Sequence, residues 1–279
     1  MKPVLCIPTY NRPDGVAIER CKDLPLRKFL FIRKEQADMY RKWTPWYTLV
    51  LQTDGTDIGL VRRNIVKYCH KKGYTWAFML DDDISKVETL GEAVGKITSN
   101  RILAGVPGPR MEIEAFKTWF KTARKYDLAI SSPNHRAYDR FNHGLLQVNR
   151  SACIQCVLIN IPVVWMLGNY KSIRETGNED YYMQYLCMSN GLLTGKIGSI
   201  EYDCPAVGAG SGGNNTEEYK DINKRYEVYV NTFLNAVCSD PKLISTKTTS
   251  SGQKSISFVW KNWGGFTEKL NFVEVNYGG

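Results

Sequence analysis

Three consecutive aspartates, Asp81 to Asp83, end a short apolar run that begins at Trp76. Adjacent carboxylates repel one another, and burying one without a partner is costly, so a positive group must lie among them. Oxygen ligands at this density suit Mg²⁺ or Mn²⁺, which keep bound waters and take further ligands from a substrate's phosphates. We therefore expect a divalent cation among these three carboxylates. The alternative is a strand-to-helix junction in which Asp83 or Ser85 caps the next helix.

Polar residues with binding chemistry also follow the other apolar runs. The motif PTYNR, with Thr9, Tyr10 and Arg12, comes directly after the first run, and Asp54 lies in a TDG turn after the third. Arg63 lies on the basic face of the helical segment that comes next. Taken singly, these motifs are typical of turns and of a solvated helix face.

A second pair of carboxylates, Glu179 and Asp180, begins an amphipathic segment with helical spacing. A carboxylate at such a position can serve as a general base when a hydroxyl lies within hydrogen-bond distance. The alternative is that the pair compensates the helix dipole, a contribution of about a few tenths of a kcal/mol.

Apolar runs alternate with helical spacing over the first 85 residues. Strands are expected over residues 4–7, 29–33, 47–52 and 76–80, and a helix is expected from Gly59 to Gly73. This alternation predicts an α/β fold with a mostly parallel, doubly wound sheet flanked by helices. Because ligands bind at the carboxyl ends of such strands, the PTYNR loop and the three aspartates lie at binding positions.

The pattern is looser after Ser85. A helix is expected over residues 112–126, and a second helix from 179 to 191. Strands are expected over residues 128–132, 143–148, 153–161 and 195–204. A glycine-rich loop at Gly208 precedes a predicted C-terminal helix over residues 219–237. The tail from Lys242 is rich in Ser, Thr and Lys and then aromatic, and it predicts a loosely attached hairpin.

The net charge of +9 is concentrated at the start of the chain. Residues 1–72 carry 15 Lys and Arg against 7 Asp and Glu, whereas the rest of the chain is nearly neutral. A basic region on a neutral body is typical of proteins that bind a polyanion, such as a nucleic acid or a phosphate-bearing substrate. A solvated surface that keeps the protein soluble is the plainer interpretation.

The eight cysteines lack the spacing of a disulfide module, which favours reduced thiols and a cytoplasmic location. Cys153 and Cys156 form a CxxC, but in a strand-like segment they should face opposite sides, and no second pair completes a zinc site. The longest apolar stretch, residues 156–167, is shorter than the roughly 20 residues that cross a bilayer. We therefore expect no membrane partner.

The order and spacing of PTYNR, TDG, the RRN helix and DDD resemble the nucleotide-sugar half of a GT-A glycosyltransferase. The resemblance covers residues 1 to about 85 and returns at the GNED stretch around Glu179 and Asp180. It implies a metal-dependent transfer of a sugar from a nucleotide-sugar, with a UDP-sugar favoured, onto an acceptor hydroxyl. It also implies a division into residues 1–85, which bind the donor, residues 86–238, which bind the acceptor, and a tail over 239–279.

The resemblance also implies roles for the donor-side residues. Thr9, Tyr10 and Arg12 would hold the nucleoside and its phosphate, and Asp54 would contact the base. Arg63 would brace the acidic cluster. The carboxylates of Asp81 and Asp83 would bridge the ribose and the Mn²⁺ or Mg²⁺ ion, and Asp82 would lie beside the donor.

Asp180, with Glu179 as the second choice, would be the base of an inverting enzyme. A departure from the family concerns the metal, because many members take a further ligand from a histidine near the end of the domain. No histidine follows His143 here. The metal would then be held more loosely, or by the glycine-rich loop through water. A retaining outcome remains open.

The acceptor is inferred from the basic first quarter and the basic, aromatic tail. The chain is similar to the phage TET-associated glycosyltransferases, which modify 5-hydroxymethylcytosine in DNA. This resemblance implies a DNA partner, a flipped base, and a location in the cytoplasm of a bacteriophage's host. The alternatives are a glycan or protein acceptor, a nucleotidyltransferase, and a non-catalytic nucleic-acid-binding module.

Overall fold

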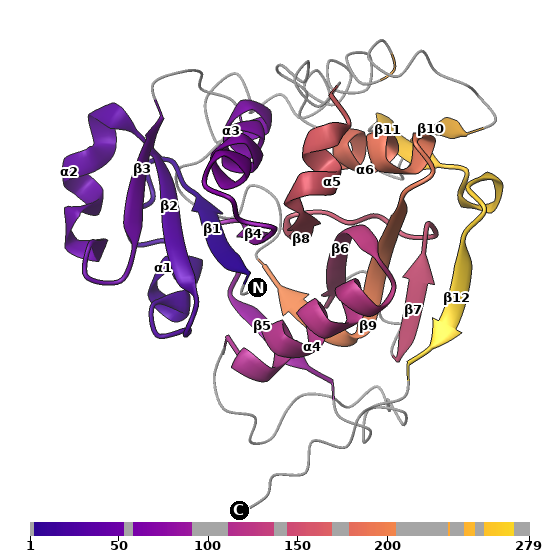
Figure 1. The fold of residues 1–279 in the computed structure, drawn as a ribbon, viewed down its shortest axis with the longest axis horizontal. Coiled ribbons are helices and arrows are strands. Elements are labelled where there is room, and N and C mark those ends of the chain that lie inside the picture. The colour runs from indigo at the N-terminus through magenta and orange to yellow at the C-terminus, as the bar shows by residue number, and fades with distance from the viewer. Residues whose placement is uncertain are drawn as a thin grey trace, which may run out of the picture.

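The computed structural model describes residues 3–52, 58–90, 111–136, 144–168, 179–204, 234, 243–248 and 254–270. Within these ranges the chain builds a ten-stranded sheet and a separate two-stranded sheet (Figure 1). In spatial order the large sheet contains β12 (Phe266–Lys269), β7 (Leu145–Val148), β9 (Leu193–Asp203), β6 (Leu128–His135), β8 (Cys156–Asn160), β4 (Trp76–Leu80), β1 (Val4–Pro8), β2 (Arg27–Arg33) and β3 (Thr48–Gln52), with β5 (Lys86–Thr89) paired to β9.

The last four strands of this order, β4, β1, β2 and β3, form the predicted parallel sheet. β1 pairs in parallel with β2 and β4, and β2 pairs in parallel with β3. Every residue of β1 and of β4 is buried, as expected for short apolar runs at the centre of a sheet. The chain therefore leaves β1 towards β2 and β3 and then returns to the other side of β1, which makes β1 and β4 the topological switch point.

The remainder of the sheet is mixed. β8 is antiparallel to both β4 and β6, while β6 and β9 are parallel. β7 and β5 are each antiparallel to β9, and β12 is antiparallel to β7. Three strands, β5, β7 and β8, therefore run against the other seven. The predicted α/β class with a mostly parallel sheet is confirmed.

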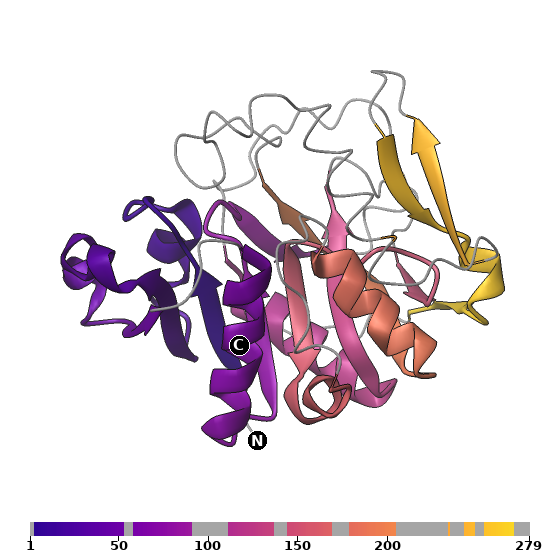
Figure 2. The same ribbon diagram turned by 90° about the horizontal axis from the view of Figure 1, so that it is seen from above.

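Helices cover both faces of the large sheet (Figures 1 and 2). The core on one face receives side chains from α1 (Val16–Cys21), α2 (Ala37–Tyr40) and α4 (Ile113–Lys125). The core on the other face receives them from α3 (Ile58–Lys71), α5 (Ile161–Met166) and α6 (Glu179–Ser189). We call these the α4 face and the α6 face. Three 3-10 turns complete the described elements, at Lys34–Gln36, Arg41–Trp43 and Trp260–Asn262.

Several expected boundaries change in the second half. The strand expected over 153–161 is β8 alone, because Pro162 lies in the first turn of α5 and the chain becomes helical from Ile161. The helix expected over 219–237 and the glycine-rich loop lie outside the described residues, apart from residue 234. The tail forms the predicted hairpin, β10 (Ile244–Thr248) with β11 (Lys254–Phe258).

The tail is more firmly attached than the sequence suggested. β12 follows the hairpin and hydrogen-bonds to β7, so the tail supplies the last strand of the large sheet. The expectation of loose attachment is wrong, because β12 has a single apolar residue, Phe266, and one such residue gives no periodic signal for strand pairing.

The described cysteines are free thiols. As predicted, the two cysteines of the CxxC are on opposite sides, with Cys153 in the core of the α6 face and Cys156 in the core of the α4 face. Among the described helices, none combines the length and the apolar character needed to cross a membrane.

Candidate active site

The loop after β1 and the acidic turn after β4 lie side by side at the switch point. The loop closes tightly on the turn, since the Ala17 amide donates to the Asp82 carbonyl at 3.0 Å. A Cβ atom on Gly15 would lie 3.0 Å from the same carbonyl oxygen. Glycine at this position therefore lets the backbone approach the acidic turn.

Asp82 is held by residues of the PTYNR motif. The Thr9 hydroxyl donates to Asp82 Oδ2 at 2.7 Å, and the Arg12 guanidinium donates to Oδ1 at 2.9 Å. Tyr40 supports both partners, through the Thr9 hydroxyl at 2.9 Å and the Arg12 amide at 3.0 Å. Burial raises the pKa of Asp82, and the bonds from Thr9 and Arg12 oppose that rise. Thr9 and Arg12 are thus brought to the acidic turn, where they fix its central carboxylate.

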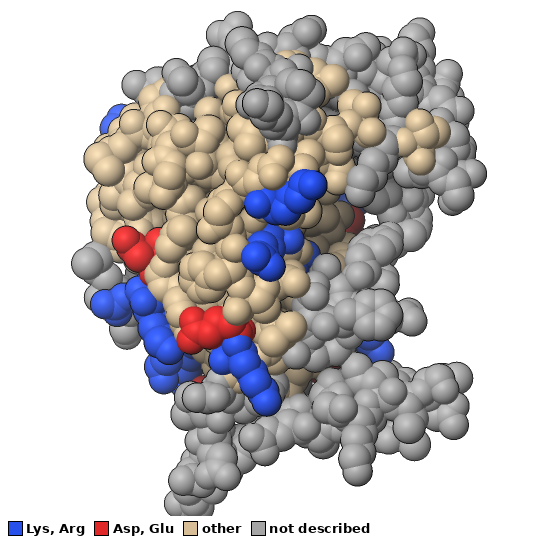
Figure 3. Space-filling model, turned by 90° about the vertical axis from the view of Figure 1, so that its right-hand side faces the viewer, with Lys and Arg blue, Asp and Glu red and all other residues tan. Residues whose placement is uncertain are grey.

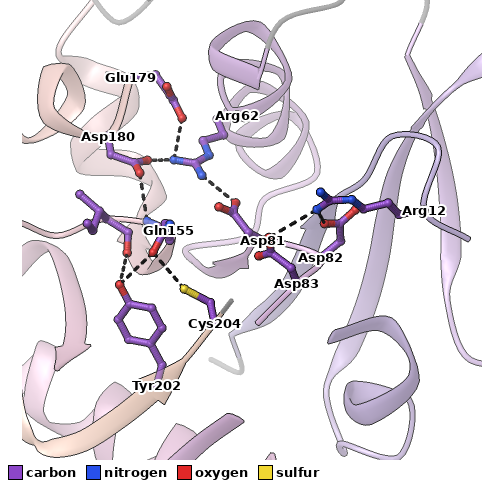
Figure 4. Close-up of polar contacts among 11 residues, drawn as sticks. Arg12, Arg62, Asp81, Asp82, Asp83, Gln155, Glu179, Asp180, Tyr202 and Cys204 are labelled. Carbon is purple, nitrogen blue, oxygen red and sulfur yellow. Dashed lines mark hydrogen bonds and ion pairs between the residues drawn. The ribbon is translucent and has the colours of Figure 1, made fainter. Parts of the chain in front are cut away.

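Asp81 meets the second carboxylate pair through a shared arginine (Figure 4). Arg62 of α3 lies 2.7 Å from Asp81 Oδ1 and 3.0 Å from Glu179 Oε1, and it also pairs with Asp180. Its side chain is 4% exposed. The fold therefore brings residues 81, 179 and 180, which are a hundred positions apart in the chain, onto one buried cation.

Burial by itself lowers the pKa of Arg62, but Asp81 and Glu179 outweigh it, so this pKa lies above its ordinary value. Burial also raises the pKa of Glu179, and Arg62 opposes that rise. The arginine thus stays charged, and its charge stabilises the ionised form of Glu179.

The arginine of these ion pairs is one position before Arg63, which the sequence analysis chose. Arg63 is half-buried on the same helix. The basic spacing drew attention to the exposed helix face, whereas Arg62 lies three and four positions before the buried Ile65 and Val66. Residues three and four positions apart share one face of a helix, so an arginine at this distance from two buried apolar residues faces the core. This spacing was the signal that could have identified Arg62.

Gln155, which the sequence analysis passed over, joins the two carboxylate groups. Its backbone amide donates to Asp180 Oδ2 at 3.0 Å, and its backbone carbonyl accepts from the backbone amide of Asp81 at 3.2 Å. Its backbone has φ 59°, in the left-handed region that few residues other than glycine adopt. Its side-chain oxygen lies 3.3 Å from the Tyr202 hydroxyl and 3.4 Å from the Cys204 sulfur.

Cys204 acts as a donor in this network. Burial, with Asp83 and Asp81 nearby, raises the pKa of its thiol to about 12, so the proton stays on sulfur. One connected set of contacts therefore reaches from α3 to β9 (Figure 4). It contains Arg62 with its three carboxylate partners, and Gln155 with Tyr202 and Cys204.

Asp83 is the most open carboxylate of the turn, with a side chain that is 40% exposed. Burial, and then the charges of Asp81 and Asp82, raise its pKa to about 6, and Arg12 at 3.4 Å only partly offsets them. A carboxylate in this environment gains from a cation. Among the described residues, however, no three His, Cys, Asp or Glu side chains are placed to hold a metal.

The donor chemistry therefore fits a divalent cation that Asp83 holds together with a substrate's phosphates and water. It does not fit a metal held by described protein ligands alone. Asp81, which the sequence analysis also assigned to the metal, has one carboxylate oxygen on Arg62.

Tyr10 lies at the same edge, beneath a guanidinium. The Arg33 carbon Cζ is 3.8 Å from the centre of the Tyr10 ring, a cation–π contact. Asp54, His143 and the glycine-rich loop lie outside the described residues.

The aromatic residues of the tail have a packing role. Trp260 and Trp263 both contact Phe258 edge-on, and Trp263 also contacts Tyr185 of α6. The Trp263 indole donates to the Leu243 carbonyl at 3.1 Å. Both tryptophans are half-buried against the core of the α6 face. On the side shown in Figure 3, described Lys and Arg side chains form separate groups, some beside acidic ones, rather than a continuous basic surface.

No protein-family model and no curated protein matches this chain. Solved structures with a similar arrangement include residues 1–349 of TarS from Staphylococcus aureus, at 8% identity, a TM-score of 0.48, and coverage of 84% of this chain and 66% of that one. A putative nucleotide-diphospho-sugar transferase from Desulfovibrio desulfuricans has 9% identity, a TM-score of 0.43, and coverage of 84% and 99%.

A third is a CMP:2-keto-3-deoxy-manno-octonic acid synthetase complexed with CTP, at 12% identity, a TM-score of 0.45, and coverage of 74% and 93%. At these TM-scores, all below 0.5, the similarity is one of overall arrangement.

Proposed function

We propose that this protein is a metal-dependent glycosyltransferase that moves a sugar from a nucleotide-sugar to an acceptor hydroxyl. The observation that carries the proposal is the acidic turn at the switch point, with two carboxylates fixed by Arg12 and Arg62 and a third, Asp83, left open with a raised pKa. A diphosphate with its divalent cation would supply the missing positive charge and occupy the crevice.

The donor would lie over the loop after β1. Tyr10 and Arg12 would contact the nucleoside and its phosphate, with Asp54 at the base, and Asp81 and Asp83 would lie towards the ribose and the cation. Thr9 would act through Asp82, because its hydroxyl is already bonded to that carboxylate. A bound Mn²⁺ or Mg²⁺ would stabilise the charge that develops on the leaving diphosphate.

Asp180 would take the proton from the acceptor hydroxyl in an inverting transfer. Its contact with Arg62 and its bond from the Gln155 amide hold it in one orientation. A carboxylate oxygen has two lone pairs, so a bond from the protein leaves room for one from the acceptor. Glu179 shares Arg62 and is the second choice.

The acceptor we propose is hydroxymethylated cytosine in DNA, in the cytoplasm of a phage-infected cell. The support is the excess of positive charge in the first 72 residues. The tail tryptophans, part of the aromatic tail from which a DNA acceptor was inferred, are omitted from this proposal because they pack on α6 and the hairpin.

The test is a panel of nucleotide-sugars, with and without Mn²⁺, incubated with DNA that contains 5-hydroxymethylcytosine. The DNA is then digested to nucleosides for mass measurement. We expect one donor to add a sugar mass to the modified cytosine only, and we expect EDTA and Asp83→Ala to abolish the addition.

Each alternative function has its own outcome. Release of pyrophosphate from a nucleoside triphosphate would identify a nucleotidyltransferase. Labelling of a glycan or peptide, but not of DNA, would show that the acceptor is not DNA. Activity that persists in EDTA would contradict the role of the metal. DNA binding without any donor turnover would identify a non-catalytic module.

A further inference from the structure

Two buried polar side chains on β6 have no hydrogen-bond partner among the residues that the structure describes. Ser132 is 0% exposed and Asn134 is 1% exposed. The Ser132 hydroxyl and both polar atoms of the Asn134 amide are unpaired. Buried polar groups in folded proteins are nearly always paired, so these three atoms need an explanation.

Both side chains point to the α6 face. Ser131 receives a hydrogen bond from Trp119 of α4, and the His135 ring packs edge-on against Tyr202 in the core of the α4 face. Since side chains alternate along a strand, the intervening Ser132 and Asn134 face the other way. This is the face on which Asp81 meets Arg62 and the first turn of α6.

The neighbouring strand adds further buried polar residues on either side of a register shift between Pro133 and Asn134. Ser132 is in register with Lys196 of β9, and Asn134 with Glu201. Lys196 is flanked by Gly195 and Ile197, which face the α4 side, so it too faces α6. Lys196 and Glu201 are 4% and 6% exposed. Charges of both signs therefore border the unpaired amide and hydroxyl, which suits a neutral ligand with donors and acceptors better than an anion.

These buried polar residues lie at the same edge of the sheet as the acidic turn. β6 runs in the same direction as β4, and only β8 lies between them. Because neighbouring strands lie about 5 Å apart, Asn134 of β6 lies roughly 10 Å from the acidic turn that follows β4. Asn134 also precedes His135, whose ring contacts Tyr202, and Tyr202 bonds to Gln155 beside Asp180.

We propose that Ser132 and Asn134 bind the hydrogen-bonding edge of the acceptor base. An amide offers a donor and an acceptor side by side, which complements the adjacent donor and acceptor on a nucleobase edge, and the serine hydroxyl can serve as either. A base flipped from the duplex would thereby be held between the unpaired groups and the acidic turn. The inference rests on the proposed transfer to DNA.

The test compares Asn134→Leu and Ser132→Ala with the wild type. Removing an unpaired buried polar group should leave the melting temperature unchanged or raise it. Hydrolysis of the donor should be unchanged, whereas KM for a 5-hydroxymethylcytosine oligonucleotide should rise about ten-fold. The matched control is Ser131→Ala, which leaves the Trp119 indole unpaired on the opposite face and should lower the melting temperature without changing KM.

An unchanged KM in both variants, with a raised melting temperature, would show that the unpaired groups have no ligand and would overturn the proposal. If Asn134→Leu does not fold, Ser132→Ala gives the same readout with the loss of one oxygen. A wild type that hydrolyses the donor but modifies only a saccharide refutes base recognition and leaves the transferase intact. If the wild type hydrolyses no donor, the proposed function fails, and binding of the same 5-hydroxymethylcytosine oligonucleotide to the variants still tests these residues.

Discussion

Asp83 differs from its two neighbours in the acidic turn, because arginines compensate Asp81 and Asp82 more closely. Its pKa of about 6 lies above the ordinary aspartate value of about 4. The folded state therefore binds this proton more tightly than the unfolded state does. The contribution of Asp83 to the free energy of unfolding is therefore most favourable below about pH 4, and it is lost as the pH rises through about 6.

Asp83→Asn should therefore stabilise the protein at neutral pH, and the gain over the wild type should grow between about pH 4 and pH 7. Thermal melting of both proteins across this range measures the gain. Mn²⁺ should raise the melting temperature of the wild type at pH 7.5 but not that of the variant. A gain in melting temperature that stays constant with pH would contradict the assigned pKa. An equal shift of the melting temperature by Mn²⁺ in both proteins would show that Asp83 does not bind the metal.

Gln155 is the residue whose backbone conformation is most informative. Its left-handed φ aims its amide at Asp180 and its carbonyl at Asp81. Strain of this kind persists where surrounding contacts impose it, and it is common at functional sites.

Gln155→Gly should keep both backbone bonds and stay within about 1 kcal/mol of the wild type, because glycine adopts this φ freely. Gln155→Val should be less stable than the glycine variant by about 2 kcal/mol or more, since a β-branched residue is strained there. Chemical denaturation measures both. Equal stability of the two variants would mean that the left-handed conformation is not maintained in solution.

At the scale of elements, Arg62 connects the turn after β4 to the first turn of α6. Removing one partner of a buried ion pair leaves an uncompensated charge, and here three carboxylates would lose their common cation. Arg62→Met should therefore cost about 3 to 5 kcal/mol of unfolding free energy. Lys67→Met, at an exposed position of the same helix, is the control and should change little. A similar loss in both variants would refute the buried role of Arg62.

The first turn of α6 offers a matched pair of variants for the chemistry. Asp180→Asn and Glu179→Gln each remove a carboxylate from Arg62 with little change of shape. If Asp180 is the base, its variant should bind the donor normally and turn over roughly 10² to 10⁴ times more slowly, while Glu179→Gln should lose much less. Single-turnover kinetics with the modified DNA compare them. The reverse order would assign the base to Glu179, and two mild effects would favour a retaining mechanism.

At the scale of the whole molecule, the two properties that suggested DNA are separable. Net charge should control affinity for duplex DNA, with a log–log salt slope of about −0.9 for each phosphate contact. The tail aromatics should instead control stability. Trp263→Ala should lower the unfolding free energy by about 1 to 3 kcal/mol and leave the salt slope unchanged. Trp46→Ala, at a 42% exposed position, is the control. A weaker salt slope or lost DNA affinity in a folded Trp263 variant would assign the tail to DNA binding.

The sequence by itself determined the parallel half of the sheet and the position of the acidic turn. Continuous apolar runs identify buried strands, and a run that ends in three aspartates marks one edge of the sheet, so β1, β4 and the meeting of residues 9 and 12 with 81–83 were predictable. These are local patterns of spacing and charge. Their interpretation required no knowledge of which distant segments meet.

Only the tertiary structure decided which distant residues complete the site. Arg62 rather than its neighbour reaches Asp81 because the rotation of α3 on the sheet sets which arginine is buried. Gln155 joins Asp81 to Asp180 because β8 lies between β4 and β6 and a residue in the left-handed conformation immediately precedes it. The unpaired Ser132 and Asn134 are recognisable only from burial and from the absence of a partner, which depend on the packing of strands far apart in the chain.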